Sequence, residues 1–277
     1  MRILLTNDDG VLSPVLHRSA AALALEHDVV VAAPAVDQSG KSHSFTHGAG
    51  KLLTYSTEGA DESTPWPQYR VDGTPSDCVK FAVSHLLKNN PPDLVIAGPN
   101  LGENAGVSAV YSGTVAAARE GALWGIPALA VSLSETSDAH LEYALEWLRA
   151  LLLAPELLPA PGTLWNINFP PCAPGSVAGA RFAPMSTVMF RDRYEETATE
   201  HKVTGYQLLG HKPAEEFVPG TDDELLARGF ITIAPLQITQ ADPAALKRLK
   251  PFEERIDALF NGRAARLSPY PISDFVP

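Results

Sequence analysis

The stretch MRILLTNDDG at residues 1–10 is an apolar run that ends abruptly in two adjacent carboxylates, Asp8 and Asp9. The run predicts a short buried strand over residues 2–5, followed by a turn-rich loop. Open parallel sheets bind ligands at the carboxyl ends of their strands. Because two buried like charges are costly without a positive partner, the stretch suggests a metal site at the head of an α/β sheet. Taken alone, NDDG fits an acidic turn that caps the next helix equally well.

Outward from this stretch, strands and helices alternate along the chain. Apolar runs predict strands, while helical spacing with capping and proline signals predicts helices. We expect strands over residues 29–33, 51–56, 68–71, 93–97, 127–133 and 163–169, and helices over residues 14–26, 75–88, 114–124 and 140–153. The β-loop-α-β start implies a parallel sheet with right-handed crossovers. The alternation, which continues to about Pro170, predicts a doubly wound, mostly parallel α/β sheet.

The pattern changes after residue 170. We expect strands over residues 181–185, 206–210 and 229–235, separated by charged and acidic stretches, and then helical stretches near residues 243–250 and 251–260. This pattern resembles a β-hairpin or arm, and such strands often pair with another subunit, so we expect oligomerisation here. We therefore predict a catalytic core over residues 1–180. Residues 181–277 would form an arm, a returning strand and C-terminal helical segments that complete the same domain.

Composition excludes several classes of protein. Of 277 residues, 45% are hydrophobic and 19% charged, which is ordinary for a globular domain. The formal net charge of −11 argues against binding to nucleic-acid polymers or anionic membranes through a basic face. The two cysteines, Cys78 and Cys172, form no CxxC pair. With no signal-peptide pattern and no apolar run near the ~20 residues of a membrane helix, we expect a cytoplasmic protein without a membrane partner.

Three predicted loops leave strands at the ligand-binding end of the sheet, and they carry oxygen-donor side chains. These side chains are Asp8, Asp9, Ser39, Asn100 and Asn104. Oxygen-only ligation suits Mg²⁺, Mn²⁺ or Ca²⁺ rather than structural zinc. Two aspartates would neutralise a divalent ion, and neutral donors leave positions to water and substrate, as in a catalytic site. Ser39 and Asn100, each taken alone, are ordinary turn residues.

The third loop ends in Tyr111-Ser112-Gly113-Thr114, and a helix follows at once. Free N–H groups at a helix N-terminus, small residues and two hydroxyls make a phosphate seat, although the same hydroxyls are common helix caps. His43 is the histidine nearest the proposed site and a candidate substrate contact, although a lone loop histidine is more often solvated. A metal and a phosphate seat together imply phosphoryl transfer to water.

In this order and on successive βα loops, the motifs resemble the SurE family of metal-dependent nucleotide phosphatases. The resemblance rests on ILLTNDDG at 3–10, AP-x-x-DQSGKSHSFT at 33–46, VDGTPSDCV at 71–79, and DLVIAGPNLGENAG-x-x-x-VYSGTVAAAREG at 93–121. LWNINFP at 164–170 and GFITIAPLQIT at 229–239 resemble its later strands. The chain departs from the family pattern at Pro99, around Gln240 and in residues 186–220.

The resemblance implies a Rossmann-like core and an arm exchanged in homodimers or homotetramers. It implies one divalent ion per subunit, Mg²⁺ or Mn²⁺, with Ca²⁺ as a substitute in crystals, held by Asp8, Asp9, Ser39 and Asn100. It also implies a phosphate site that includes Asn104, Ser112, Gly113 and Thr114. The expected substrate is a nucleoside monophosphate, most simply a 5'-nucleotide, with 3'-nucleotides and short polyphosphate as further candidates.

For the mechanism, we expect Asn104, Ser112 and Thr114 to donate hydrogen bonds to the phosphoryl oxygens. Asp9 would anchor the metal, and Asp8 would be a ligand that also orients or deprotonates the attacking water. A phospho-aspartate route through Asp8 is the mechanistic alternative. The rival from another class is a non-catalytic nucleotide-binding or assembly protein on the same fold. NDDGVL is not the G-x-G-x-x-G of a nicotinamide dehydrogenase.

Overall fold

The structure is a computed structural model that describes residues 1–48, 50–57, 64–198, 204–253 and 256–257. The chain divides into two compact units, Met1–Ile238 and Thr239–Pro277. In the second unit, helix α7 spans Pro243–Leu249 and a 3₁₀ turn spans Lys250–Phe252. The second predicted helical stretch falls partly on residues outside those described. No helix in the described part of the chain is long and apolar enough to cross a membrane.

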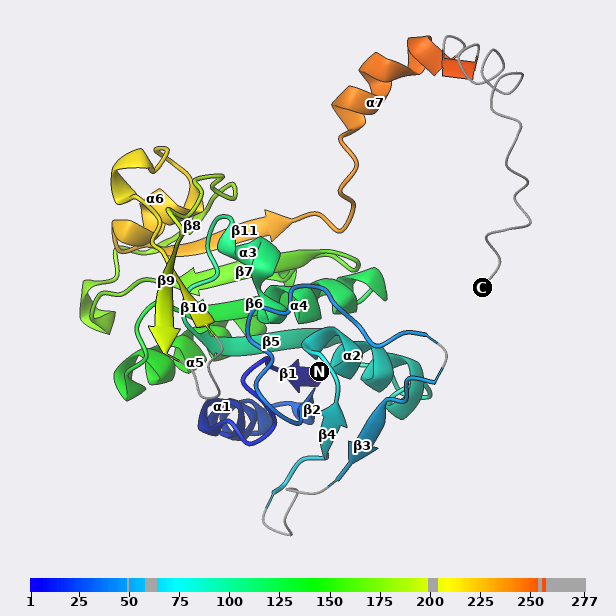
Figure 1. Ribbon diagram of the computed structural model, residues 1–277. Helices are drawn as coiled ribbons and strands as arrows, with labels where there is room; N and C mark the ends of the chain where they lie inside the picture. The colour runs from blue at the N-terminus through cyan, green and yellow to red at the C-terminus, as the bar shows by residue number, and fades with distance from the viewer. Residues whose placement is uncertain (49, 58–63, 199–203, 254–255, 258–277) are drawn as a thin grey trace. The chain divides into compact units, whose positions relative to one another are not determined.

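The first unit is built on a mostly parallel sheet, as predicted. Across the described residues this main sheet has nine strands in the order β3-β4-β2-β1-β5-β6-β7-β11-β8 (Figure 1). Their bounds are Arg2–Thr6 (β1), Asp28–Pro34 (β2), Thr54–Ser56 (β3), Gln68–Asp72 (β4), Leu94–Leu101 (β5), Ala128–Leu133 (β6), Leu164–Phe169 (β7), Ala180–Phe182 (β8) and Ile231–Leu236 (β11). The strands from β4 to β7 pair in parallel, while β3 and β11 pair antiparallel with β4 and β7. The segment predicted to follow the core contains β11, which pairs inside this sheet. The boundary proposed at residue 180 would therefore divide one domain, and it stays a prediction.

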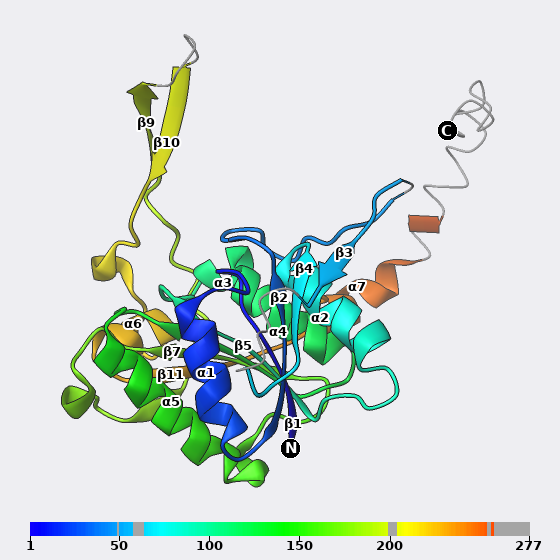
Figure 2. The same ribbon diagram turned by 90° about the horizontal axis from the view of Figure 1, so that it is seen from below.

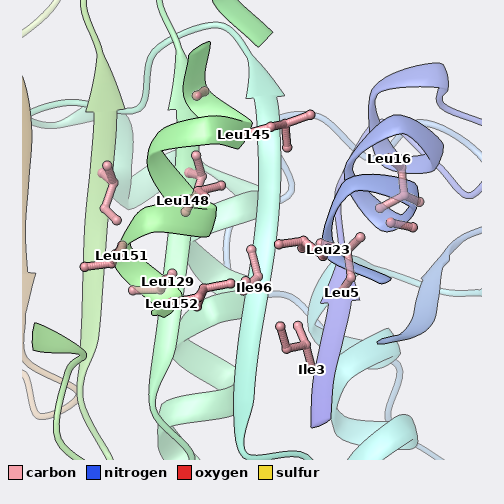
Figure 3. Packing of buried hydrophobic residues seen from close by; sticks show 14 of the residues in the cluster. Ile3, Leu5, Leu16, Leu23, Ile96, Leu129, Leu145, Leu148, Leu151 and Leu152 are labelled. Carbon is pink, nitrogen blue, oxygen red and sulfur yellow. The ribbon is translucent and has the colours of Figure 1, made fainter. Parts of the chain in front are cut away.

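Helices cover both faces of the main sheet. Residues of α1 (Pro14–Ala24) and α5 (Asp138–Leu152) share a buried cluster with Leu5 and Ile96 (Figure 3). Residues of α2 (Pro75–Phe81) and α4 (Gly113–Leu123) share the opposite cluster with Leu4, because successive side chains of a strand point to opposite faces. A fully buried leucine such as Leu148 of α5 would cost about 2–5 kcal/mol to truncate to alanine.

The chain reverses its direction across the sheet at β1, which lies between β2 and β5. It leaves β1 through α1 to β2 on one side, and returns through α2 and the π-helical turn Ala82–Leu86 to β5 on the other. The crevice beyond the carboxyl ends of β1 and β5 is therefore a topological switch point, where open α/β sheets bind ligands. Thr6 and Ala97 pair at this end, so the NDDG loop lies beside the last residues of β5, which continues to Leu101.

The strand β5 runs further than its apolar run predicts. The register shifts between Ala97 and Asn100, and pairing with β6 resumes at Asn100 and Ser132. Gly98 permits the irregularity because its φ is +106° and a Cβ there would lie 2.2 Å from the carbonyl oxygen of Val131. Pro99, one of the departures from the family pattern, therefore lies inside a strand that still presents Asn100. The short helix α3 (Ser108–Tyr111) was not predicted within the loop that follows.

The arm contains a separate antiparallel sheet, made of β9 (Arg193–Ala198) and β10 (Thr204–Leu209), that stands apart from the main sheet (Figure 2). The charged stretch that holds β9 was expected only to separate strands. Its charged side chains are exposed, so no buried face produces the alternation by which a strand is recognised. In the acidic stretch, α6 (Asp222–Ala227) begins with three acidic residues, which stabilise a helix N-terminus.

Candidate active site

The NDDG loop at the end of β1 is closed by Asn7. Its Oδ1 accepts a hydrogen bond from the N–H of Gly10 at 3.2 Å, and its Nδ2 donates to the carbonyl of Gly10 at 3.0 Å. Gly10 has a φ of +104°, which favours glycine. This turn places Asp8 and Asp9 directly beyond the central strand.

Asp8 is 4% exposed and lies against the N-terminus of α4. Its Oδ1 accepts a hydrogen bond from the Thr114 hydroxyl at 2.5 Å. A Cβ at Gly113 would lie 2.9 Å from Asp8 Oδ2, so glycine is what allows the approach. Burial raises the pKa of Asp8, although the hydrogen bonds from Thr114 act in the opposite direction. The predicted metal ligand and the predicted phosphate seat are thus in direct contact.

Asp9 carries a buried oxygen, Oδ2, that has no hydrogen-bond partner among the described residues. Burial, together with the negative charges of Asp8 and Asp37, raises the pKa of Asp9 to about 6. An unpartnered buried oxygen beside a second carboxylate is a site that a cation would stabilise.

The second loop of the site, which follows β2, packs on the NDDG loop. The N–H of Gln38 donates to the carbonyl of Asp8 at 2.8 Å. The N–H and hydroxyl of Ser39 both donate to Asp37 Oδ1, at 2.7 and 2.6 Å, and these bonds lower the pKa of Asp37. Since the hydroxyl proton points to Asp37, the lone pairs of Ser39 are available to a cation. The sequence analysis assigned no role to Asp37. The D-x-S spacing, which is typical of an Asx turn, could have indicated that Asp37 accepts hydrogen bonds from Ser39.

The two asparagines of the third loop are held differently. Asn100 Nδ2 donates to the carbonyl of Gly102 at 2.7 Å, and Oδ1 is the acceptor atom of the same amide. Asn104 is buried, its N–H donates to Asn168 Oδ1 at 2.7 Å, and its Nδ2 donates to the Ser132 hydroxyl at 2.9 Å. Asn104 is therefore fixed by β6 and β7, beneath the loop that carries it.

A cavity of about 170 Å³ brings Asp8 together with residues of the phosphate seat. Its described lining residues include Asp8, Gly40, Asn104 and Ser112, but not Asp9, Ser39 or Asn100. Ser112 is also the N-cap of α4, since its oxygen accepts a hydrogen bond from the N–H of Val115 at 3.1 Å. Capping and phosphate binding are compatible here, because a capping hydroxyl keeps its own proton for a ligand.

His43 does not line this cavity. Its Nε2 lies 2.8 Å from Oε2 of Glu120, a buried residue of α4. Glu120 also contacts Lys80 Nζ at 2.6 Å and accepts from Trp124 Nε1 at 2.9 Å. Burial alone would raise the pKa of Glu120, but these three partners hold it at about 2. The sequence analysis did not identify Glu120. A carboxylate among the apolar residues of an alanine-rich helix could have indicated it.

The donor set decides whether a cation fits. Within the described residues, no three His, Cys, Asp or Glu side chains cluster as metal ligands. A cation at this edge of the sheet would therefore need neutral donors besides Asp8 and Asp9. Ser39 offers a hydroxyl oxygen and Asn100 an amide oxygen, and the unpartnered Oδ2 of Asp9 is a carboxylate oxygen. This all-oxygen set fits a hard divalent cation.

Comparisons with known proteins agree with this geometry. Residues 3–192 match the family model described as survival protein SurE. The chain is 39% identical over 242 residues to "5'-nucleotidase SurE 1" of Thermus thermophilus, covering 86% of this chain and 92% of that protein. It is 37% identical over 261 residues to "5'-nucleotidase SurE" of Nitrosococcus oceani, covering 92% and 99%. The crystal structure of the SurE protein from Aquifex aeolicus superposes with a TM-score of 0.75 at 28% identity, covering 91% of this chain and 100% of that one.

Proposed function

Because this chain belongs to the survival protein SurE family, we propose that it is a metal-dependent 5'-nucleotidase that hydrolyses nucleoside monophosphates to nucleoside and phosphate. The observation that carries the proposal is the contact between Asp8 and the first turn of α4, in a cavity that Asp8 lines together with Ser112, the N-cap of the anion seat. The relatives are named as nucleotidases, so a non-catalytic binding protein is not favoured. 3'-Nucleotides and short polyphosphate are further candidate substrates.

For the cofactor, we propose one divalent cation per subunit, Mg²⁺ or Mn²⁺, with Ca²⁺ as a substitute. Asp8, Asp9, Ser39 and Asn100 would hold it. The raised pKa of Asp9 and its unpartnered oxygen support this assignment, since a cation would favour the charged carboxylate. When bound, such a cation supplies Lewis-acid polarisation of the phosphate.

The phosphate would lie at the N-terminus of α4, where the N–H groups of Gly113 and Thr114 have no partner within the helix. Ser112 would donate its hydroxyl proton, and Asn104 would donate from an amide that neighbouring strands hold in place. Charge spreads over the phosphoryl oxygens during transfer, so donors that need no rearrangement lower the barrier. The Thr114 hydroxyl already donates to Asp8, so Thr114 would bind phosphate through its N–H.

Asp8 would orient the attacking water and accept its proton, because its carboxylate lines the cavity beside the phosphate seat. The alternative is attack by Asp8 itself to form a phospho-aspartate. Rapid quenching during turnover separates the two routes. We expect no hydroxylamine-sensitive phosphoprotein in the wild type, and trapping one would rule out direct attack by water.

We propose a positioning role for His43, because its bond to Glu120 ties the loop of Ser39 to α4. We propose self-association through the arm into a dimer or tetramer, supported by the exposed Tyr194 and Tyr206 of the hairpin. We propose a cytoplasmic location, supported by two unpaired cysteines.

The proposed activity is tested by phosphate release from a panel of 5'- and 3'-nucleoside monophosphates, with Mg²⁺, with Mn²⁺ and with chelator. We expect turnover that chelator abolishes and added metal restores. Asp9→Asn should lower kcat/KM roughly 100-fold or more, since even indirect partners of metal ligands are worth ~10–100-fold. Near-normal turnover in a folded Asp9→Asn protein would contradict the ligand assignment, and turnover of no phosphate ester would contradict the function.

A further inference from the structure

A second cavity adjoins the proposed phosphate cavity. It has a volume of about 410 Å³ and is lined by Tyr111, Phe190, Asp192, Leu208 and Gly210. Tyr111 and Phe190 also line the cavity that contains Asp8, Asn104 and Ser112. The two cavities therefore share an aromatic wall, with the polar cavity at the end of β1 and the larger one at the base of the hairpin. A volume of this size lies within the roughly 300–1,000 Å³ of small-molecule sites.

The lining of the outer cavity selects a class of ligand. Its described lining residues include two aromatic rings and one aliphatic side chain, and Asp192 is the single charge among them. None of those described lining residues is basic, so the outer cavity does not suit a second phosphate. Aromatic faces favour a planar ring. A carboxylate accepts hydrogen bonds and donates none when ionised, so it selects a group with N–H or O–H donors.

The hairpin base holds Asp192 in position. A Cβ at Gly210 would lie 2.4 Å from Asp192 Oδ1, so glycine at this position lets the carboxylate fold against the opposite strand. The N–H of Arg191 donates to the carbonyl of His211 at 2.9 Å and closes the base of the hairpin. The carboxylate of Asp192 thus lies at a hairpin base that is closed by a backbone hydrogen bond.

The aromatic wall is held by a buried ion-pair cluster. Lys212 Nζ lies 5.7 Å from the centroid of the Phe190 ring, within the range of a cation–π contact. The same ammonium contacts Asp223 at 2.5 Å and Glu103 at 2.8 Å, and donates to the carbonyl of Ala105 at 3.2 Å. Glu103 and Ala105 flank Asn104, so Phe190 is fixed relative to the loop of the phosphate site.

We propose that the outer cavity binds the nucleoside of the substrate while the inner cavity binds its phosphate; this inference rests on the proposed nucleotidase function. The base lies against Tyr111, Phe190 and Leu208, and Asp192 accepts a hydrogen bond from a ribose hydroxyl or an exocyclic amino group. The negative charge of Asp192 also disfavours further phosphates, because they would occupy the outer cavity. The hairpin is then a specificity element that separates nucleoside monophosphates from simple phosphate esters and from polyphosphorylated nucleotides.

The test compares a nucleotide with a phosphate ester that lacks a base. KM and kcat are measured for adenosine monophosphate and for glycerol phosphate in the wild type, Leu208→Ala and Asp192→Asn. We expect KM for the nucleotide to rise about tenfold, a loss of ~1.4 kcal/mol of binding, with KM for glycerol phosphate and kcat for both unchanged. Asp192→Asn should also lower the ratio of kcat/KM for adenosine monophosphate to kcat/KM for adenosine triphosphate.

Gln207→Ala is the matched control, because Gln207 is exposed and alternates with Leu208 onto the other face of β10. It should leave both KM values unchanged. Equal changes for the two esters, or no change in either variant, would overturn the nucleoside site while the nucleotidase function stands. Wild-type protein that hydrolyses neither ester would overturn the function itself. Calorimetry with adenosine alone gives a readout without turnover: binding to the wild type that is lost in Leu208→Ala supports the site, and equal binding overturns it.

Discussion

Lys212 and Asp223 form a buried ion pair, with Nζ 2.5 Å from Oδ1 and side chains that are 6% and 1% exposed. The pair joins the segment after the hairpin to α6. Through Glu103 the same ammonium reaches the loop that carries Asn104. Asp222 adds a second link, because its Oδ2 accepts from the N–H of Gly106 at 2.8 Å. Ion pairs and a hydrogen bond therefore link the loop that carries Asn104 to the arm, although the two segments are far apart in sequence.

Replacing Lys212 should destabilise the protein strongly. Lys212→Met would leave Asp223 buried and unpaired, a change that costs about 3–5 kcal/mol. Urea denaturation followed by circular dichroism measures the loss. Arg191→Met is the control, because its ion pair with Glu216 is exposed and should be worth less than about 1 kcal/mol. Equal midpoints for the two variants would show that the buried pair does not stabilise the fold.

Removing the charge of Asp9 should stabilise the metal-free protein although it lowers the activity. A carboxyl whose pKa is raised to about 6 in the folded state contributes stability that is present at low pH and is lost as pH rises through 6. At pH 8, metal-free Asp9→Asn should therefore exceed the wild type by roughly 1–3 kcal/mol, after allowance for partial exposure. Thermal denaturation with chelator at pH 8, pH 5 and pH 4 measures the difference, which should be about half as large at pH 5 as at pH 8 and small at pH 4. Asp72→Asn, at an exposed position on β4, is the control.

Glu120 should protect the fold against acid. Its pKa is lowered from an ordinary value of 4.5 to about 2, so its contribution is complete above 4.5 and is lost as pH falls towards 2. Glu120→Gln should cost about 3 kcal/mol at pH 7, and the gap to the wild type should close between pH 4.5 and 2. Urea midpoints across this range measure it, with the exposed Glu156→Gln as control. A gap that is constant with pH would contradict the role of the charge.

Gly113 should be required for activity more than for stability. In Gly113→Ala the new Cβ would lie 2.9 Å from Asp8 Oδ2, so the carboxylate or the start of α4 must shift. A displacement near 1 Å at a reacting group can cost ~100-fold in rate. Phosphate release by the folded variant tests this. Gly175→Ala, where a Cβ would meet no atom within 4 Å, should retain full activity, and equal activities in the two variants would refute the argument.

Local signals made the core predictable. The first strand and α1 follow from an apolar run and from Ser13 and Pro14, which occupy the N-cap and the first helical position. The motifs on successive loops also allowed the family to be identified before the structure was known, and the comparisons confirm it. Each of these features depends on residues close together in the sequence.

The features that escaped prediction depend on distant partners. β9 becomes a strand by pairing with β10, and its exposed charges conceal that pairing from sequence reasoning. His43 contacts Glu120 across 77 positions, and the Thr114 hydroxyl contacts Asp8 across 106. Spacing indicated which side chains would gather at the crevice. It could not indicate which hydroxyl holds which carboxylate, because tertiary packing decides that.

The position of β1 between two parallel neighbours has a consequence for local unfolding. A central strand loses its hydrogen bonds only when the whole sheet opens, whereas a two-stranded hairpin opens at a lower free energy. Amide hydrogens of β1 should therefore exchange with solvent at the rate of global unfolding, and those of β9 and β10 much sooner. The carboxylates beyond β1 would stay in place through many openings of the hairpin. The acidic part of the site would then keep its geometry while the outer cavity at the hairpin base opens and exchanges its ligand.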